Sequence, residues 1–437
     1  MKVLVLNCGS SSVKFQVIET SLAMIEANTD VTLARGAVEK IGLSDSRLSL
    51  HVPGRKPHQE IAEILEHRAA VERVLKVLVN PEHGVLGNVA EIEAVGHRVV
   101  HGGEKFASSV LVSPEVEAMI EECVVLAPLH NPHNLRGLTA ARSLLPRVPH
   151  IAVFDTAFHQ SMPPKAFVYG LPYELYTRQA IRRYGFHGTS HRFVSIRTAN
   201  LLRRPIEDLR IVTCHLGNGC SMAAVDRGHS VDTSMGFTPL EGLLMGTRCG
   251  DLDAAIVPWV LAMEEVTLAQ LNAMLNKHSG LYGVSGVSSD MREIEAACAT
   301  GNKRACLALD IFCYRVRKYV GAYAAAMGGL DAVTFTGGIG ENSPLIRAST
   351  LAGMDFFGIE LDEDANRNAP RGEEVLVSRP GTRVAVAVIP TNEERTRSAS
   401  SPATPSASSG ASCPRSRSPA PRRPAEGPPP PDRPVHG

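Results

Sequence analysis

The chain has 437 residues, of which 44% are hydrophobic, and its 45 Lys and Arg balance 45 Asp and Glu. This composition is typical of a globular protein with a sizeable core, and at roughly 150 residues per domain the length predicts two lobes. It excludes a small disulfide-stapled scaffold, and the zero net charge indicates neither a nucleic-acid nor an acidic membrane partner.

Short segments rich in Val and Ile alternate with longer segments of helical periodicity. The predicted strands are 2–6, 13–18, 93–100, 149–155, 210–215, 221–225, 332–336 and 383–389. The predicted helices are 60–78, 189–203, 305–327 and a pair within 252–277 that breaks near Val266. This alternation predicts an α/β protein whose helices flank its sheets.

Two segments far apart in the chain share one pattern. Residues 3–19 and 211–228 both read as strand, glycine-containing turn and strand. A repeated pattern of this kind predicts that two halves of the protein follow one plan.

The N-terminus and the cysteines indicate the compartment. The opening MKVLVLNCG is too short in apolar residues for a signal-peptide core, and no apolar run approaches the ~18 residues of a membrane helix. The nine cysteines are odd in number and contain no CxxC pair. We therefore expect a cytoplasmic protein with reduced thiols and no structural zinc.

Three glycine-rich turns follow apolar strands, at Asn7–Ser12, His215–Ser221 and Gly337–Asn342. Glycine lets backbone N–H groups approach phosphate oxygens closely, so each turn is a candidate phosphate cradle, although any one alone also reads as an ordinary hairpin turn. None matches the P-loop or the dinucleotide-binding GxGxxG pattern, which argues against a P-loop NTPase and a Rossmann dehydrogenase.

Three charged residues stand beside glycines or at a strand end. Arg98 lies in GHRVVHGG and Arg248 in MGTRCGD, where planar guanidinium groups suit carboxylate and phosphate oxygens; surface ion pairing is the alternative for each. Asp155 follows the strand IAVF, and a carboxylate at the carboxyl end of a strand commonly faces the cleft of an α/β protein. A turn or helix cap is its alternative.

Ten motifs punctuate the first 395 residues. They are NCGSSSVK (7–14), GHRVVHGGEKF (96–106), APLHNPHN (127–134), FDTAFHQSMP (154–163), YGFHGTSH (184–191), HLGNGCSM (215–222), PLEGLLMGTRCGD (239–251), GVSSDMR (286–292), GGIGENS (337–343) and PTNEE (390–394). In order and spacing they resemble the acetate kinase family.

The resemblance implies a fold and a reaction. The fold is a two-lobed actin-like ATPase with a duplicated ribonuclease H-like core and a central cleft, its N-terminal lobe being 1–156 with 386–395 returning to it, and its C-terminal lobe 157–385. The reaction is direct, reversible transfer of phosphate from ATP to acetate, giving acetyl phosphate and ADP, with Mg²⁺, for which Mn²⁺ is a substitute. The family also implies a homodimer formed through the C-terminal lobe, without nucleic acid or membrane.

The resemblance also implies roles for individual residues. Arg98 and Arg248 would hold the carboxylate and the transferring phosphoryl group, His187 would donate a hydrogen bond to that group, and Asp155 would orient an arginine or metal-bound water. Asn7 and Glu393 match the metal-side positions, although Glu393 also reads as part of a helix start.

Further positions match the nucleotide and acetate sites. The nucleotide positions are Lys14, His215, Leu216, Gly217, Asn218, Gly219, Asp290, Met291, Arg292, Gly338, Ile339, Gly340 and Asn342. Val100, Leu129, Phe186 and Pro239 match an apolar pocket around the acetate methyl group, where Val100 leaves little room for propionate. His130 also matches a site position, but a lone histidine is more often structural.

The chain departs from the family after Glu394. Family members continue with an apolar residue and an amphipathic helix, whereas residues 396–437 are rich in Pro, Ser and Arg and cannot bury enough apolar surface to order. We interpret this tail as disordered and frameshift-like; a basic tail for RNA or acidic lipid is the alternative. Ala254 also stands at a position where family members often have Pro.

Three other functions compete with an acetate kinase. They are a propionate or short-chain carboxylate kinase, an inactive nucleotide-binding relative with a damaged C-terminus, and an Hsp70-like ATPase, which would need a substrate domain that the sequence lacks.

Overall fold

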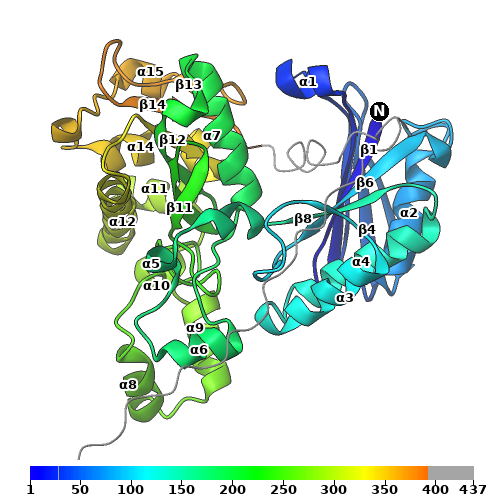
Figure 1. Cartoon of the computed structure of the whole chain (residues 1–437), viewed down its shortest axis with the longest axis horizontal. Coiled ribbons are helices and arrows are strands. Elements are labelled where there is room, and N and C mark those ends of the chain that lie inside the picture. The colour runs from blue at the N-terminus through cyan, green and yellow to red at the C-terminus, as the bar shows by residue number, and fades with distance from the viewer. Residues whose placement is uncertain (28, 392–437) are drawn as a thin grey trace, which may run out of the picture. The chain divides into compact units, whose positions relative to one another are not determined.

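The computed structural model describes residues 1–27 and 29–391 (Figure 1). Glu393 and the predicted disordered tail from residue 396 lie outside the described residues. Both sheets of the protein belong to one compact unit. The predicted lobe boundary between residues 156 and 157 therefore stays a prediction.

The first sheet has eight strands in the order β5-β4-β3-β2-β1-β6-β8-β7. Their bounds are β1 (Lys2–Cys8), β2 (Ser12–Glu19), β3 (Val31–Glu39), β4 (Leu43–His51), β5 (His58–Ile64), β6 (Ile92–Val99), β7 (Val110–Leu111) and β8 (His150–Phe154). The central strands are apolar, as expected of strands covered on both faces. Leu4 and Leu6 of β1 face a core formed with α2 (His67–Leu78) and α4 (Asn131–Leu144).

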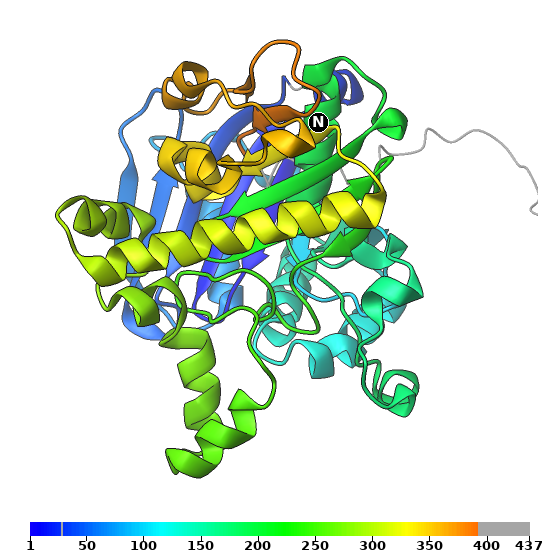
Figure 2. The same cartoon turned by 90° about the vertical axis from the view of Figure 1, so that its left-hand side faces the viewer.

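The second sheet has six strands in the order β11-β10-β9-β12-β14-β13. Their bounds are β9 (Arg210–Leu216), β10 (Cys220–Asp226), β11 (His229–Thr233), β12 (Ala332–Thr336), β13 (Val375–Leu376) and β14 (Ala385–Val388). The 25-residue α12 (Lys303–Met327) packs on it and crosses in front of it in Figure 2. α7 (Gly188–Leu202) also packs on this sheet, against β9 and β12.

Other helices connect these layers. They are α1 (Leu22–Ala27), α3 (Pro114–Glu122), α5 (Pro164–Phe167), α6 (Tyr173–Gln179), α8 (Ile256–Met263), α9 (Leu268–Lys277), α10 (Gly280–Ser285), α11 (Met291–Ala299), α13 (Gly337–Asn342), α14 (Pro344–Leu351) and α15 (Glu363–Arg367). In residues 1–27 and 29–391, no helix combines the length and the apolar content that crossing a membrane requires.

The two sheets confirm the predicted duplication. In the first, β3-β2-β1 are antiparallel and β1-β6-β8 are parallel; in the second, β11-β10-β9 are antiparallel and β9-β12-β14 are parallel. The repeated hairpins are β1–β2 and β9–β10, so both sheets are built on the ribonuclease H-like plan. Each hairpin places its glycine-containing turn at the corresponding end of its sheet.

Three local predictions are wrong. The predicted helix 60–78 begins instead with the edge strand β5, because EIAEIL alternates exposed and covered side chains with a period of two. The turn at Gly337–Asn342 is the short helix α13, which Gly337 enters at a φ of +77°. Residues 386–388, assigned to the return toward the N-terminal lobe, pair with β12 in the second sheet.

The prediction of reduced thiols is wrong for one pair. Cys298 at the end of α11 and Cys306 in the first turns of α12 form a disulfide, because the short connection between the two helices brings their Cα atoms to 4.7 Å. Six other cysteines in the described residues are free thiols.

Candidate active site

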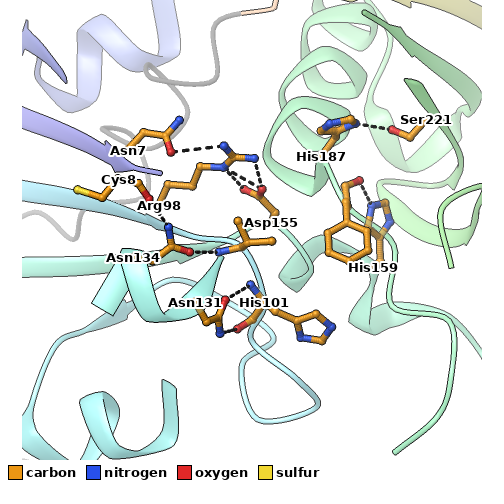
Figure 3. Close-up of polar contacts among 12 residues, drawn as sticks. Asn7, Cys8, Arg98, His101, Asn131, Asn134, Asp155, His159, His187 and Ser221 are labelled. Atoms are coloured by element: carbon orange, nitrogen blue, oxygen red, sulfur yellow. Dashed lines mark hydrogen bonds and ion pairs between the residues drawn. The ribbon is translucent and has the colours of Figure 1, made fainter. Parts of the chain in front are cut away.

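Arg98 at the end of β6 is held by a carboxylate and an amide. Its Nε donates to both carboxylate oxygens of Asp155, at 3.1 and 2.8 Å, and its Nη2 donates to Oδ2 at 2.6 Å. Its Nη1 donates to Oδ1 of Asn7 at 3.4 Å (Figure 3). Because two nitrogen atoms donate charge-assisted bonds to one carboxylate, the plane of the guanidinium group is fixed and Arg98 is oriented before any ligand binds.

Asp155 directly follows β8 and is only 2% exposed. Its backbone N–H donates to the carbonyl of Val99 on the neighbouring strand, at 3.1 Å, and its carbonyl accepts from Gly188 N at 2.8 Å. Gly188 begins α7, so Asp155 joins the end of the first sheet to the helix that packs on the second. A side chain at Gly188 would meet the Asp155 carbonyl at 2.4 Å, which explains the glycine there.

His187 precedes α7 in a left-handed conformation, at φ 55°. Its Nδ1 lies 2.8 Å from Ser221 Oγ, and its ring centroid lies 4.3 Å from that of His215. Burial lowers the pKa of His187 well below its ordinary value, and the neighbouring His215, Arg98 and Arg248 lower it further. His187 is therefore a neutral imidazole at physiological pH.

Arg248 lies opposite the glycine-rich turn between β9 and β10. Its Nη1 donates to the carbonyl of Pro239 at 3.2 Å, and burial lowers its pKa. A Cβ placed on Gly219 would lie 3.5 Å from Nη1 of Arg248 and 4.0 Å from Nε2 of His187. The space left by the missing side chain is thus bordered by a guanidinium group and an imidazole.

Arg98 and Arg248 lower the pKa of the same two histidines. Burial lowers the pKa of His130, and Arg98 and Arg248 lower it further, as they do for His187. Both arginines therefore lie near His130 and His187. From the sequence alone, His130 is a weak candidate for a site residue. Its position near both arginines is visible only in the fold.

Eight of the predicted nucleotide residues line one cavity of about 640 Å³. They are Gly217, Asn218, Asp290, Met291, Arg292, Gly338, Ile339 and Asn342. This volume suits a nucleotide-sized ligand. Asp290 caps α11 and pairs with Arg292, which lowers the pKa of Asp290 to about 2. Sequence reasoning missed Glu295 and Arg371, which also line the cavity and belong to none of the ten motifs.

The structure places two predicted residues elsewhere. Lys14 lines a different cavity of about 830 Å³ on the face of β2, β3 and β4, together with Arg35 and Thr391. Leu129 is 73% exposed, whereas Val100 and Phe186 belong to one buried cluster. The remaining nucleotide positions, His215, Leu216, Gly219 and Gly340, lie at the turns that border the cavity or beneath them.

The oxygen donors beside Arg98 fit a divalent ion. Asn7 and Asp155 present amide and carboxylate oxygens to the same guanidinium group. Mg²⁺ takes one or two protein oxygens and keeps waters and phosphate oxygens as its other ligands, so a larger protein cluster is not required. Within the described residues no group of three or more His, Cys, Asp or Glu side chains is arranged to hold a metal.

Buried histidines around the site should make stability depend on pH. Burial lowers the pKa of His159 and of His101 to about 4, against 6.5 in the unfolded chain. Below pH 6.5 the unfolded state binds protons that the folded state excludes, so the free energy of unfolding should fall by about 2 kcal/mol per histidine between pH 7 and pH 5. Chemical denaturation at both pH values measures this. His159→Asn should make the free energy of unfolding depend less steeply on pH. An equally steep dependence in the variant would contradict the lowered pKa of His159.

Comparisons with known proteins identify the family of this chain. Residues 2–398 match the model of the Acetokinase family. Acetate kinases from Symbiobacterium thermophilum and Alkaliphilus metalliredigens are each 54% identical over 394 residues, covering 90% of this chain and 96% and 97% of theirs. Among solved structures, a Porphyromonas gingivalis acetate kinase has a TM-score of 0.87 at 48% identity, and a Francisella tularensis propionate kinase has 0.82 at 39%; both alignments cover 91% of this chain and 98% of the other. The chain therefore belongs to the acetokinase family.

Proposed function

We propose that this chain is an acetate kinase, which transfers the γ-phosphoryl group of ATP to acetate in a reversible, Mg²⁺-dependent reaction. The observation that supports the proposal is that Arg98, fixed by Asp155, and Arg248, which borders the same space as His187, both lie near His187. Two guanidinium groups around one space suit the joint binding of a carboxylate and a phosphoryl group. The adenosine of ATP would occupy the cavity that Asp290 and Ile339 line.

The reaction needs positioning more than covalent catalysis. A carboxylate oxygen of acetate forms a bond to Pγ, the bond from Pγ to the β–γ bridging oxygen breaks, and ADP leaves with that electron pair. The transition state is loose and carries negative charge on its equatorial oxygens. Arg98 orients acetate, while Arg248 and the Nε2–H group of neutral His187 donate to the oxygens of the transferring group. A divalent cation held by Asn7 and Glu393, with Asp155 orienting a water bound to it, would neutralise charge on the phosphate oxygens.

A direct assay tests this function. The purified 437-residue protein, with ATP and Mg²⁺, should form ADP only when acetate is added, and hydroxylamine should trap acetyl phosphate. ADP formation that is independent of acetate would instead indicate an Hsp70-like ATPase. Nucleotide binding without turnover would indicate the inactive relative. Replacing Mg²⁺ by Mn²⁺ in the same assay compares the rates of ADP formation that the two ions support.

Val100 supports acetate over propionate as the substrate. Its side chain is 8% exposed and packs in one buried cluster with Phe186. Val100→Ala should raise the propionate-to-acetate ratio of kcat/KM by about tenfold or more, because one methylene in an apolar pocket is worth about 1–3 kcal/mol. Val99→Ala is the matched control: Val99 is also buried, but it packs in a different cluster. An equal shift in both variants would refute the pocket.

We also propose that the protein forms a homodimer through α8. The helix reads IVPWVLAM, yet none of its residues is buried, and Ile256, Trp259 and Met263 are 45%, 60% and 63% exposed. In Figures 1 and 2 the α8–α9 pair projects away from the second sheet. An exposed apolar surface of this kind commonly binds a partner. Light scattering should give a dimer for the parent chain and a monomer for Trp259→Glu; a monomeric parent would contradict the proposal.

We propose that the reaction takes place in the cytoplasm, which supplies ATP for the forward reaction and ADP for the reverse reaction. Fractionation of the native host tests this location, and activity confined to a membrane or extracellular fraction would contradict it.

A further inference from the structure

A chain of buried polar groups leads from His187 into the second sheet. α7 carries His191, four residues after His187, and both imidazoles contact the hydroxyl of Ser221. β10 carries Ser221 and β9 carries Thr213. Ser221, His191 and Thr213 have no exposed surface in the folded chain.

The contacts along this chain are short and continuous. Nδ1 of His187 and Nε2 of His191 both lie 2.8 Å from Ser221 Oγ, and Nδ1 of His191 lies 2.7 Å from Thr213 Oγ1 (Figure 3 shows the first of these contacts). Because a hydroxyl has one proton, Ser221 donates to one of the two imidazoles and accepts from the other. The direction of the whole chain therefore follows from any one link.

Thr213 sets that direction. The other acceptor near its hydroxyl is the carbonyl of Ala223, at 3.4 Å, a long contact compared with the 2.7 Å to His191. We assign the Thr213 proton to the shorter contact, with Nδ1 of His191, so that the His191 proton is on Nε2 and is donated to Ser221. Ser221 in turn donates to Nδ1 of His187, which leaves the His187 proton on Nε2.

We propose that Ser221, anchored by His191 and Thr213, is a positioning residue that holds His187 in the tautomer whose Nε2–H faces the transferring phosphoryl group. With the proton on Nδ1 instead, His187 would present a lone pair to phosphate oxygens and repel them. The proposal rests on the proposed function, because the oxygens that His187 would bind belong to ATP. Nε2 already borders the space beside Gly219 and Arg248.

The fold contains a matched control for this role. Ser230 is equally buried, and its hydroxyl lies 2.7 Å from Nδ1 of His159, which contacts the carbonyl of Phe186 through its Nε2 rather than the region between the arginines. Ser221→Ala and Ser230→Ala thus remove the same hydroxyl from the same kind of partner. Only the first removal changes the tautomer of His187.

Kinetics of the full chain with ATP, Mg²⁺ and acetate test the proposal. Ser221→Ala should lower kcat about 10- to 100-fold with both KM values within about twofold, which is less than the roughly 10²–10³-fold that complete removal of such a donor costs, because His187 itself remains. Ser221→Thr, which keeps the hydroxyl, should recover most of the loss, and Ser230→Ala should keep kcat within about twofold of the parent. Equal losses in the two alanine variants would overturn the proposal, as would a normal kcat for Ser221→Ala.

Nitrogen-15 NMR of histidine-labelled protein supplies a second measurement, which does not require activity. His187 should appear as the Nε2–H tautomer in the parent chain and should lose that preference in Ser221→Ala. A His187 proton on Nδ1 in the parent would overturn the proposal even if acetate kinase activity is present. Conversely, the expected tautomer in a chain without acetate-dependent turnover would contradict the proposed function and leave the relay intact.

Discussion

Arg248→Ala should lower kcat roughly a thousandfold, the scale on which an arginine stabilises phosphoryl-transfer charge. Arg248 borders the space beside Gly219 together with His187, so its loss removes a cation from the position where negative charge develops. The measurement is steady-state ADP formation with saturating ATP and acetate. Arg248→Lys should stay well below the parent, because an ammonium group lacks the planar fork.

The same change should leave the fold intact. Burial lowers the pKa of Arg248, which means that its charge is costly there, and among the described residues its Nη1 contacts the Pro239 carbonyl and the sulfur of Met245 rather than a carboxylate. Removing it should therefore not lower the free energy of unfolding. Arg379→Ala, which removes a surface partner of Glu360, is the control and should keep full activity. Near-normal turnover of Arg248→Ala would refute its role.

Asp155→Asn should lower kcat/KM for acetate about a hundredfold, because fixed donors of this kind are commonly worth 10²–10³. The amide keeps the shape of the side chain but has one oxygen fewer to accept from Arg98, and it has no charge. Arg98 would then lose its fixed plane before acetate binds. Initial rates measured at varied acetate concentrations give kcat/KM for acetate directly.

This variant should also be less stable, in contrast to Arg248→Ala. Asp155 is 2% exposed and Arg98 23%, and weakening hydrogen bonds to a charged group costs about 1.5–3 kcal/mol. Denaturant titration measures that loss. Asp45→Asn, which removes an exposed partner of Lys40, should change neither activity nor stability measurably. An Asp155→Asn enzyme with the parental kcat/KM would show that Arg98 does not depend on this carboxylate.

Much of the fold follows from local patterns in the sequence. All eight predicted strands are present, because runs of Val and Ile that end at polar or glycine-rich turns are a local signal. The sequence predicts a helix at β5 because EIAEILEHRAAVERVLKVL satisfies a helical period from its second half onward, and the edge pairing with β4 is not visible in the sequence. β3, β4 and β11 were missed for the same reason: their mixed, half-exposed residues become strands by pairing with neighbours.

The sequence by itself determined the family, the duplicated plan and the identity of most cavity residues, because these are carried by short motifs whose chemistry is local. Only the tertiary structure decided which groups touch. Arg98 meets a carboxylate 57 residues away, Ser221 joins two histidines of another element, and Lys14 and Leu129 lie away from their predicted partners. The physical reason is that hydrogen-bond partners and burial depend on how distant strands and helices pack, and residue spacing along the chain does not record that packing.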